Sequence, residues 1–125
     1  MTFLLVGQMQ SGKNRVLITR TGHRYPPKRF ALWRDEMVHQ LYFQTSGVLK
    51  PIFPNPRPVS LTVRYWPGDK IRRDATGILD ALCHVLEKIR IIEDDAQIKA
   101  VDWKEMALDR TNPRVELSLV EQRVG

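Results

Sequence analysis

The chain contains a single cysteine, has no long apolar run and begins without a basic segment. With Cys83 alone among 125 residues, no internal disulfide can form, so a reducing compartment is the expected location. No stretch approaches the roughly 18 consecutive apolar residues of a membrane-spanning helix, and the first ten residues lack the charged start of a secretory signal. These absences favour a cytoplasmic protein with no membrane partner. A hydrophobic fraction of 42% and a charged fraction of 27% are typical of one folded domain over residues 1–125.

Acidic residues are scarce in the first part of the chain and frequent in the rest. Residues 1–73 contain 13 Lys or Arg against 3 acids, a balance of +10, whereas residues 74–125 contain 7 against 11, a balance of −4. A basic surface suits a phosphate backbone, and a local acidic pocket suits cations. Uneven charge also arises by chance along a chain, so the asymmetry alone does not establish a nucleic-acid enzyme.

Apolar periodicity predicts an α+β fold, with a mixed or antiparallel sheet of four to five strands and two main helices packed on it. Residues 28–44 and 76–88 have helical spacing, and the second helix has a core stripe of Ile78, Leu82, Val85, Leu86 and Ile89. Residues 59–66 alternate as a strand, with the buried face expected at Val59, Leu61, Val63 and Tyr65. The other expected strands are residues 2–6, residues 15–19 returning beside them, and residues 97–106 and 114–120.

The segment GQMQSGKN, residues 7–14, is similar to a phosphate-binding loop but fails two of its requirements. It matches G-x-x-x-x-G-K, yet the next position holds Asn14, where a Ser or Thr hydroxyl is needed as a magnesium ligand. The following residues, RVLIT, favour a strand, whereas a phosphate loop must open a helix. An ATPase is therefore not expected.

Three carboxylates flank the second predicted helix, with Asp74 before it and Asp94 and Asp95 after it. Clustered carboxylates repel one another unless a cation neutralises them, so we expect a divalent metal with oxygen ligands, Mg²⁺ or alternatively Mn²⁺. Such a metal site can hydrolyse a phosphodiester bond. Cleavage of nucleic acid is one interpretation, and solvated charges at two helix ends are the other.

Cations that would contact a polyanion fall into two groups. The first directly precedes the helix and would neutralise the scissile and adjacent phosphates: Lys70, Arg72 and Arg73. The second lies towards the N-terminus and would follow the duplex arms further out: Lys13, Arg15, Arg20, Arg24, Lys28 and Arg29. Such contacts fix the position of DNA without reading its sequence. A soluble basic surface is the alternative for both groups.

The segments RDATGI, residues 73–78, and DDAQI, residues 94–98, resemble a known pair of motifs at the right spacing. In the RusA-type Holliday junction resolvases the first motif is Arg/Pro-Asp-x-Asp-Asn-Leu and the second is Asp-Asp-x-Gln-Ile. The resemblance covers most of the chain and implies a homodimeric, Mg²⁺-dependent endodeoxyribonuclease. It would bind four-way or other branched DNA and resolve it by paired symmetric nicks in recombination and repair. The resemblance implies that Asp74 and the Asp94–Asp95 pair are catalytic. Our hypothesis is that Asp74, Asp95 and either Asp94 or Asp80 hold the metal.

Four positions depart from the family pattern. Thr76 replaces the second aspartate of the first motif, Gly77 replaces its Asn, Asp80 replaces a helical Lys, and His84 replaces a later Asp. Thr76, Asp80 and His84 follow i, i+4 and i+8, so they share one face of the predicted helix, away from its core stripe. This face either lines the metal pocket, with Asp80 as the replacement carboxylate and His84 as a ligand or proton carrier, or is simply solvated.

Nuclease activity is the favoured function, and two other classes stay open. A non-catalytic or weakened DNA-binding protein on the same scaffold is favoured by the replacements at positions 76 and 80. A scaffold protein would bind neither DNA nor metal. Cys83 is expected to be a small core residue and not a nucleophile, because no activating partner is evident. Trp66 and Trp103 are candidate dimer contacts, although core packing explains each of them as well.

Overall fold

The computed structural model describes residues 1–10, 17–18, 20–22, 24–25, 28–47 and 49–122 of the chain. In chain order its elements are β1 (Thr2–Val6), β2 (Leu17–Ile18), β3 (Arg24–Tyr25), α1 (Lys28–Thr45), β4 (Val59–Trp66), α2 (Ala75–Lys88), the 3-10 turn η1 (Asp95–Gln97), β5 (Ile98–Glu105) and β6 (Arg114–Glu121). Among these residues no helix combines the length and apolarity needed to cross a bilayer.

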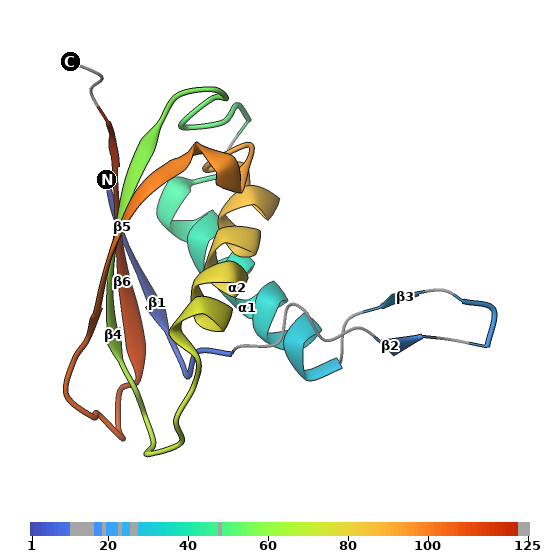
Figure 1. Ribbon diagram of the computed structural model, residues 1–125, viewed down its shortest axis with the longest axis vertical. Coiled ribbons are helices and arrows are strands. Elements are labelled where there is room, and N and C mark those ends of the chain that lie inside the picture. The colour runs from blue at the N-terminus through green and yellow to red at the C-terminus, as the bar shows by residue number, and fades with distance from the viewer. Residues whose placement is uncertain (11–16, 19, 23, 26–27, 48, 123–125) are drawn as a thin grey trace.

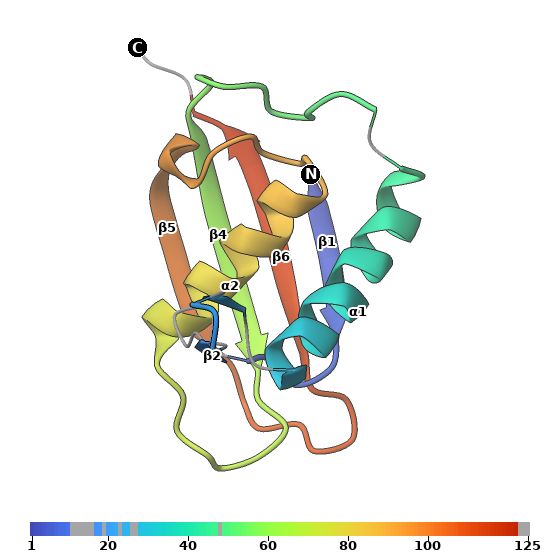
Figure 2. The ribbon, with the colours of Figure 1, turned by 90° about the vertical axis from the view of Figure 1, so that its right-hand side faces the viewer.

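Four strands form one mixed sheet in the order β1-β6-β4-β5. The pairs β1–β6 and β6–β4 are antiparallel, whereas β4 and β5 run parallel and are joined through α2. Both helices lie on the same face of this sheet, and no helix of the described residues lies on the opposite face (Figures 1 and 2). The predicted α+β fold, a mixed sheet with two main helices packed on it, is confirmed.

The core lies between the sheet and the two helices. In β4 the alternate residues Val59, Leu61, Val63 and Tyr65 are buried, as their period of two predicts. In α2 the predicted stripe is buried as well, together with Ala81 and Cys83. Cys83 is therefore buried in the core, as expected for a small apolar side chain.

Strand β2 differs from the sequence-based expectation. We expected residues 15–19 to return beside residues 2–6, but Leu17 pairs with Tyr25 and Ile18 with Arg24 in a separate two-stranded ribbon. This β2–β3 ribbon projects from the helical side of the molecule, away from the sheet (Figure 1). The partner of β1 is instead the distant β6, with Leu4 opposite Glu116.

The edge of β1 that does not pair with β6 is occupied by side chains of α1. Gln40 accepts from the Val6 N–H at 2.7 Å and donates to the Val6 carbonyl at 2.8 Å. One helical turn later, Gln44 makes the same pair of bonds with Leu4, at 2.9 and 2.7 Å. The two amides therefore replace a neighbouring strand and protect an otherwise open edge.

Candidate metal centre and the two ends of helix α2

Asp74 caps the N-terminus of α2. Its carboxylate accepts a hydrogen bond from the Thr76 N–H at 3.2 Å, and its own backbone is extended, as is usual for a capping residue. The side chains of Asp74 and Thr76 are exposed at the start of the helix. A carboxylate at this position interacts favourably with the positive end of the helix dipole. Asp74 thus has a structural role in addition to the catalytic role predicted for it.

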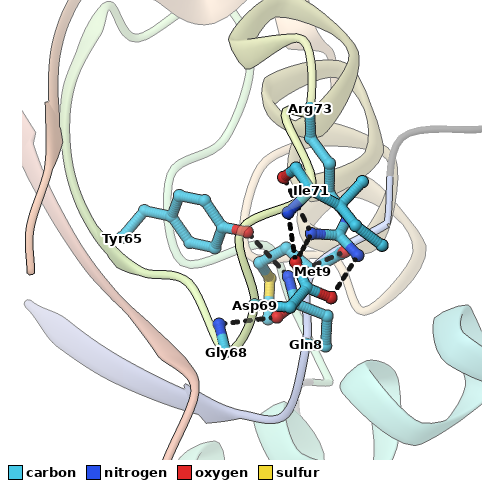
Figure 3. Close-up of polar contacts among 7 residues, drawn as sticks. All are labelled: Gln8, Met9, Tyr65, Gly68, Asp69, Ile71 and Arg73. Carbon is cyan, nitrogen blue, oxygen red and sulfur yellow. Dashed lines mark hydrogen bonds and ion pairs between the residues drawn. The ribbon is translucent and has the colours of Figure 1, made fainter. Parts of the chain in front are cut away.

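The loop before α2 is held by a polar network in which Arg73 is already engaged (Figure 3). Arg73 donates two hydrogen bonds to Asp69, at 2.7 and 3.0 Å, and only 13% of its side chain is exposed. The bonds from Arg73 lower the pKa of Asp69, against a smaller opposing effect of burial, and they raise the pKa of Arg73 in return. Arg73 therefore shapes the loop, and its guanidinium is not free to meet a phosphate without breaking this pair.

Gln8 anchors the same loop from the other side. Its amide oxygen accepts the Gly68 N–H at 2.7 Å, and its amide nitrogen donates to the hydroxyl of the buried Tyr65, also at 2.7 Å (Figure 3). Gly68 is required here, because a Cβ atom at this position would lie 2.9 Å from both Gln8 Oε1 and Pro113 Cβ. The loop that carries the predicted phosphate-binding cations is thus fixed at both ends.

Lys70 and Arg72 are the two cations of this loop that stay available. Both are exposed, and neither takes part in an ion pair within the ranges described above. Of the three cations predicted to neutralise phosphates, two therefore retain that capacity and Arg73 is committed to Asp69.

The other end of α2 brings together three carboxylates. One oxygen each from Glu87, Asp94 and Asp95 lies within 4.8 Å of the other two. Glu87 is half-buried on the last turn of α2, and the two aspartates are exposed. None of the three forms an ion pair with a cation in the described part of the chain. Oxygen ligands at this spacing suit Mg²⁺ or Mn²⁺, so this cluster is the candidate metal centre.

Local hydrogen bonds explain why Glu87 and the aspartates converge. The Asp95 N–H donates to Glu87 Oε1 at 2.5 Å, which folds the chain back onto the last turn of α2. Asp94 caps η1 by accepting from the Ala96 N–H at 2.9 Å, within a capping box that includes Gln97. The oxygens that make these bonds retain further lone pairs for a cation.

Gln97 supports this segment from inside the protein. It is 2% exposed, and its amide oxygen accepts the N–H groups of Glu93 at 2.8 Å and Asp94 at 3.0 Å. Its amide nitrogen donates to the carbonyls of Phe53 at 2.9 Å and Arg57 at 3.0 Å. Gln97 therefore satisfies four backbone groups and ties the acidic segment to the loop before β4.

The predicted carboxylates are not all brought together within one chain. Asp94 and Asp95 lie beside Glu87, but Glu87 is 13 positions along α2 from Asp74. At 1.5 Å per residue this corresponds to about 20 Å along the helix axis. Figure 2 shows the two helix ends at opposite ends of the molecule. One chain thus supplies the acidic cluster at the C-terminal end of α2 and a separate capping aspartate at its N-terminal end.

The polar face of α2 runs between these ends. Asp80 is half-buried and lies six residues after Asp74 and seven before Glu87, so it is about 9–10 Å along the axis from each. His84 is half-buried one turn before Glu87, with its ring 6.0 Å from that of Phe30 on α1. Asp80 therefore joins neither carboxylate group directly. Glu87 was missed from sequence, although extending the polar face by one turn beyond His84 would have found it.

Of the six outer cations predicted to bind DNA, two lie on the β2–β3 ribbon, and two others, Lys28 and Arg29, are exposed in the first turn of α1. Arg20 is exposed at the turn of this ribbon, next to Thr21. Arg24 lies in β3, and its side chain is not among those described. Lys13 and Arg15 lie outside the described residues.

The two tryptophans considered as dimer contacts both pack within the chain. The guanidinium carbon of Arg114 lies 4.1 Å from the centre of the Trp66 ring, and the ring centres of Trp103 and Tyr65 are 5.9 Å apart.

Comparison with known proteins gives no assignment: no protein-family model matches the chain, and no curated protein matches it either.

Proposed function

We propose that this protein is a divalent-metal-dependent endodeoxyribonuclease that acts on branched DNA, in the manner of a Holliday junction resolvase. The observation that carries the proposal is the group of Glu87, Asp94 and Asp95, whose oxygens converge within 4.8 Å. Its two aspartates are those of the DDAQI segment on which the resemblance to the resolvases rests most firmly.

The donor set fits the metal that this chemistry needs. Three carboxylates in close proximity repel one another, and a bound cation would relieve this repulsion. Mg²⁺ takes oxygen ligands and keeps several of its waters, so two or three carboxylates are enough to hold it, and Mn²⁺ accepts the same ligands. Such an ion, when bound, would neutralise charge on the scissile phosphate and activate a water molecule for its attack.

The residues of this chain would perform the remaining tasks. Glu87, Asp94 and Asp95 would hold the cation, and Gln97 would keep the two aspartates in place through its bonds to the backbone. Lys70 and Arg72 would bind phosphates at the far end of α2. Because contacts to phosphates do not distinguish one base from another, these two residues would position the DNA without selecting its sequence.

A homodimer would account for the separation of Asp74 from the other carboxylates. If two copies pack with their α2 helices antiparallel about a two-fold axis, the N-terminus of one helix lies beside the C-terminus of the other. The partner's Asp74 would then approach Asp94 and Asp95 of the first copy. An isologous dimer also matches the near two-fold symmetry of a four-way junction and would place two equivalent centres for paired nicks. A cytoplasmic location, inferred from the single cysteine, accompanies this proposal.

A non-catalytic junction-binding protein is the second candidate, and the position of Asp80 favours it. The family's second aspartate is Thr76 in this chain, and Asp80 lies about 9–10 Å along α2 from either carboxylate group, too far for direct ligation within one protomer. Such a protein would keep Lys70 and Arg72 for phosphate binding and would bind a junction without cutting it.

Cleavage of a labelled four-way junction and of a matched linear duplex separates the two candidates. Reactions with Mg²⁺, with Mn²⁺ and with EDTA would be run on the wild type, Asp95→Asn and Asp74→Asn. Asparagine is as good a helix cap as aspartate, so Asp74→Asn removes the charge without removing the cap. Asp102→Asn, an exposed aspartate of β5 outside the cluster, is the control.

Metal-dependent paired nicks in the junction alone, retained in Asp102→Asn and lost in both other variants, are the expected result. Tight junction binding without cleavage under either metal would reject the nuclease and leave the binding protein.

A further inference from the structure

A groove opens beside the N-terminal end of α2, outside the carboxylate cluster. It lies between the loop after β4 and the residues at and beyond the end of β5, and its volume is about 610 Å³. Its lining includes Lys70, Ile71, Arg72, Glu105, Met106 and Leu108. This volume falls within the usual range of small-molecule sites, about 300–1,000 Å³.

The two walls of the groove are tied to each other by backbone hydrogen bonds. The Met106 N–H donates to the Tyr65 carbonyl at 2.7 Å, and the Asp109 N–H donates to the Pro67 carbonyl at 2.8 Å. The loop wall is further fixed by Gln8 and by the Asp69–Arg73 pair. The groove therefore exists before any ligand arrives, and a ligand would not have to order it.

The lining combines exposed apolar side chains with positive charge. Ile71 is 66% exposed and Leu108 is 38% exposed, so both present apolar surface that a ligand could cover. Lys70 and Arg72 form no ion pair with any residue that the structure describes, whereas the charge of Asp69 is balanced by Arg73. Glu105 is the remaining carboxylate in the lining, and it can accept a hydrogen bond from an amino group.

We propose that this groove binds one unpaired nucleotide, with its base against Ile71, Met106 and Leu108 and its phosphate at Lys70 and Arg72. A nucleotide has the three features that the groove complements: a flat apolar face, an edge with amino donors for Glu105, and an anionic phosphate. A base inside a duplex is stacked on both faces and cannot enter, so the ligand is a nucleotide released from the stack or a free one. Binding of an unpaired nucleotide within DNA rests on the proposed function, because unstacked nucleotides occur at the branch points of the DNA on which the protein is proposed to act.

Binding in EDTA tests the groove separately from cleavage. The probes are a labelled duplex with one unpaired adenine, the same duplex with an abasic site in place of that adenine, and free dAMP as a competitor. We expect the wild type to bind the unpaired base about tenfold more tightly than the abasic site, which is within the range for stacking one base on protein.

The variants that remove the apolar wall are Ile71→Ser and Leu108→Ser, alone and together. Both positions are solvent-exposed in part, so folding should be kept, and far-UV circular dichroism with a thermal melt would verify this. Leu49→Ser, at a side chain that is 94% exposed and does not line the groove, is the matched control. The double variant should lose the preference for the unpaired base, and the control should keep it.

Three results would distinguish the possible outcomes. Equal affinity for the unpaired base and the abasic site, together with no competition by dAMP, would overturn the groove proposal. So would a preference that survives in the double variant. Competition by dAMP that requires Ile71 and Leu108, without a preference in DNA, would support the groove as a site for free nucleotides.

Cleavage in Mg²⁺ is measured in parallel so that the two proposals fail separately. A lost base preference with nicking retained would reject the groove alone. A base preference without nicking would reject the nuclease alone.

Discussion

Replacement of Gln97 by leucine should destabilise the protein and disorganise the carboxylate cluster at the same time. The change removes four hydrogen bonds, two accepted from the backbone of the acidic segment and two donated to carbonyls of the loop before β4. Leucine has a similar size and is apolar, so it fills the space without providing any of the four partners.

The magnitude follows from the count of bonds and their burial. At about 1 kcal/mol for each hydrogen bond, four lost bonds give an upper value of about 4 kcal/mol. The N–H groups of Glu93 and Asp94 belong to exposed residues and can be rehydrated, so we expect a loss of about 2–4 kcal/mol in the free energy of unfolding. Gln97→Glu retains the two accepted bonds and loses the two donated ones, and its charge would be buried, so it should be no more stable than Gln97→Leu at neutral pH.

Urea unfolding monitored by tryptophan fluorescence measures this effect, provided that the slope of the unfolding free energy against urea concentration is the same in all variants. Gln122→Leu, at an exposed position, is the control and should change stability by less than about 0.5 kcal/mol. A loss of less than about 1 kcal/mol for Gln97→Leu would refute the view that Gln97 holds the acidic segment in place.

Three further predictions concern the sheet edge, the loop and the helix cap. The double variant Gln40→Ala/Gln44→Ala should lose about 2–4 kcal/mol of stability and self-associate more readily, because four hydrogen bonds are lost and the edge of β1 is exposed; unfolding and light scattering would measure both effects. Asp69→Asn should destabilise the loop at neutral pH, and its difference from the wild type should disappear as pH falls below the ordinary aspartate value of 3.8. Because the pKa of Asp69 is lowered in the folded protein, the ionised carboxylate stabilises the fold at pH values above 3.8, and this stabilisation is lost as the folded protein takes up the proton. A difference in stability between Asp69→Asn and the wild type that does not change with pH would contradict this. Asp74→Ala should lower stability by about 1 kcal/mol, whereas Asp74→Asn should not, and thermal melts of the two variants would show the contrast.

The elements with strong apolar periodicity were predictable from sequence. The stripe of α2 and the alternation of β4 were identified residue by residue, because the period of the pattern matches the geometry of a helix or a strand. The pairing of β1 with β6 and the parallel pairing of β4 with β5 were not predicted, since local pattern does not specify which strands meet. The two side-chain amides that close the edge of β1 give no sequence signal beyond a spacing of four residues.

The candidate site was only partly predictable. Asp94 and Asp95 are neighbours in sequence and so in space, but Asp74 was grouped with them across a helix whose own length, 14 residues at 1.5 Å each, keeps the ends about 21 Å apart. That arithmetic was available from the sequence and indicates that a composite site needs a second copy of the chain. Arg73 was assigned to phosphates, and its pairing with Asp69 four residues earlier depends on the shape of the loop, which the sequence did not reveal.

Direct titration with Mn²⁺, followed by electron paramagnetic resonance, tests the central claim that Glu87, Asp94 and Asp95 form a metal site. The wild type and Asp102→Asn should bind the ion with equal affinity. Glu87→Gln should bind it at least about tenfold more weakly, since even the outer partners of metal ligands change affinity by that order. Equal binding by Glu87→Gln and the wild type, or no binding by any of the three proteins, would contradict the assignment of this cluster as the metal centre.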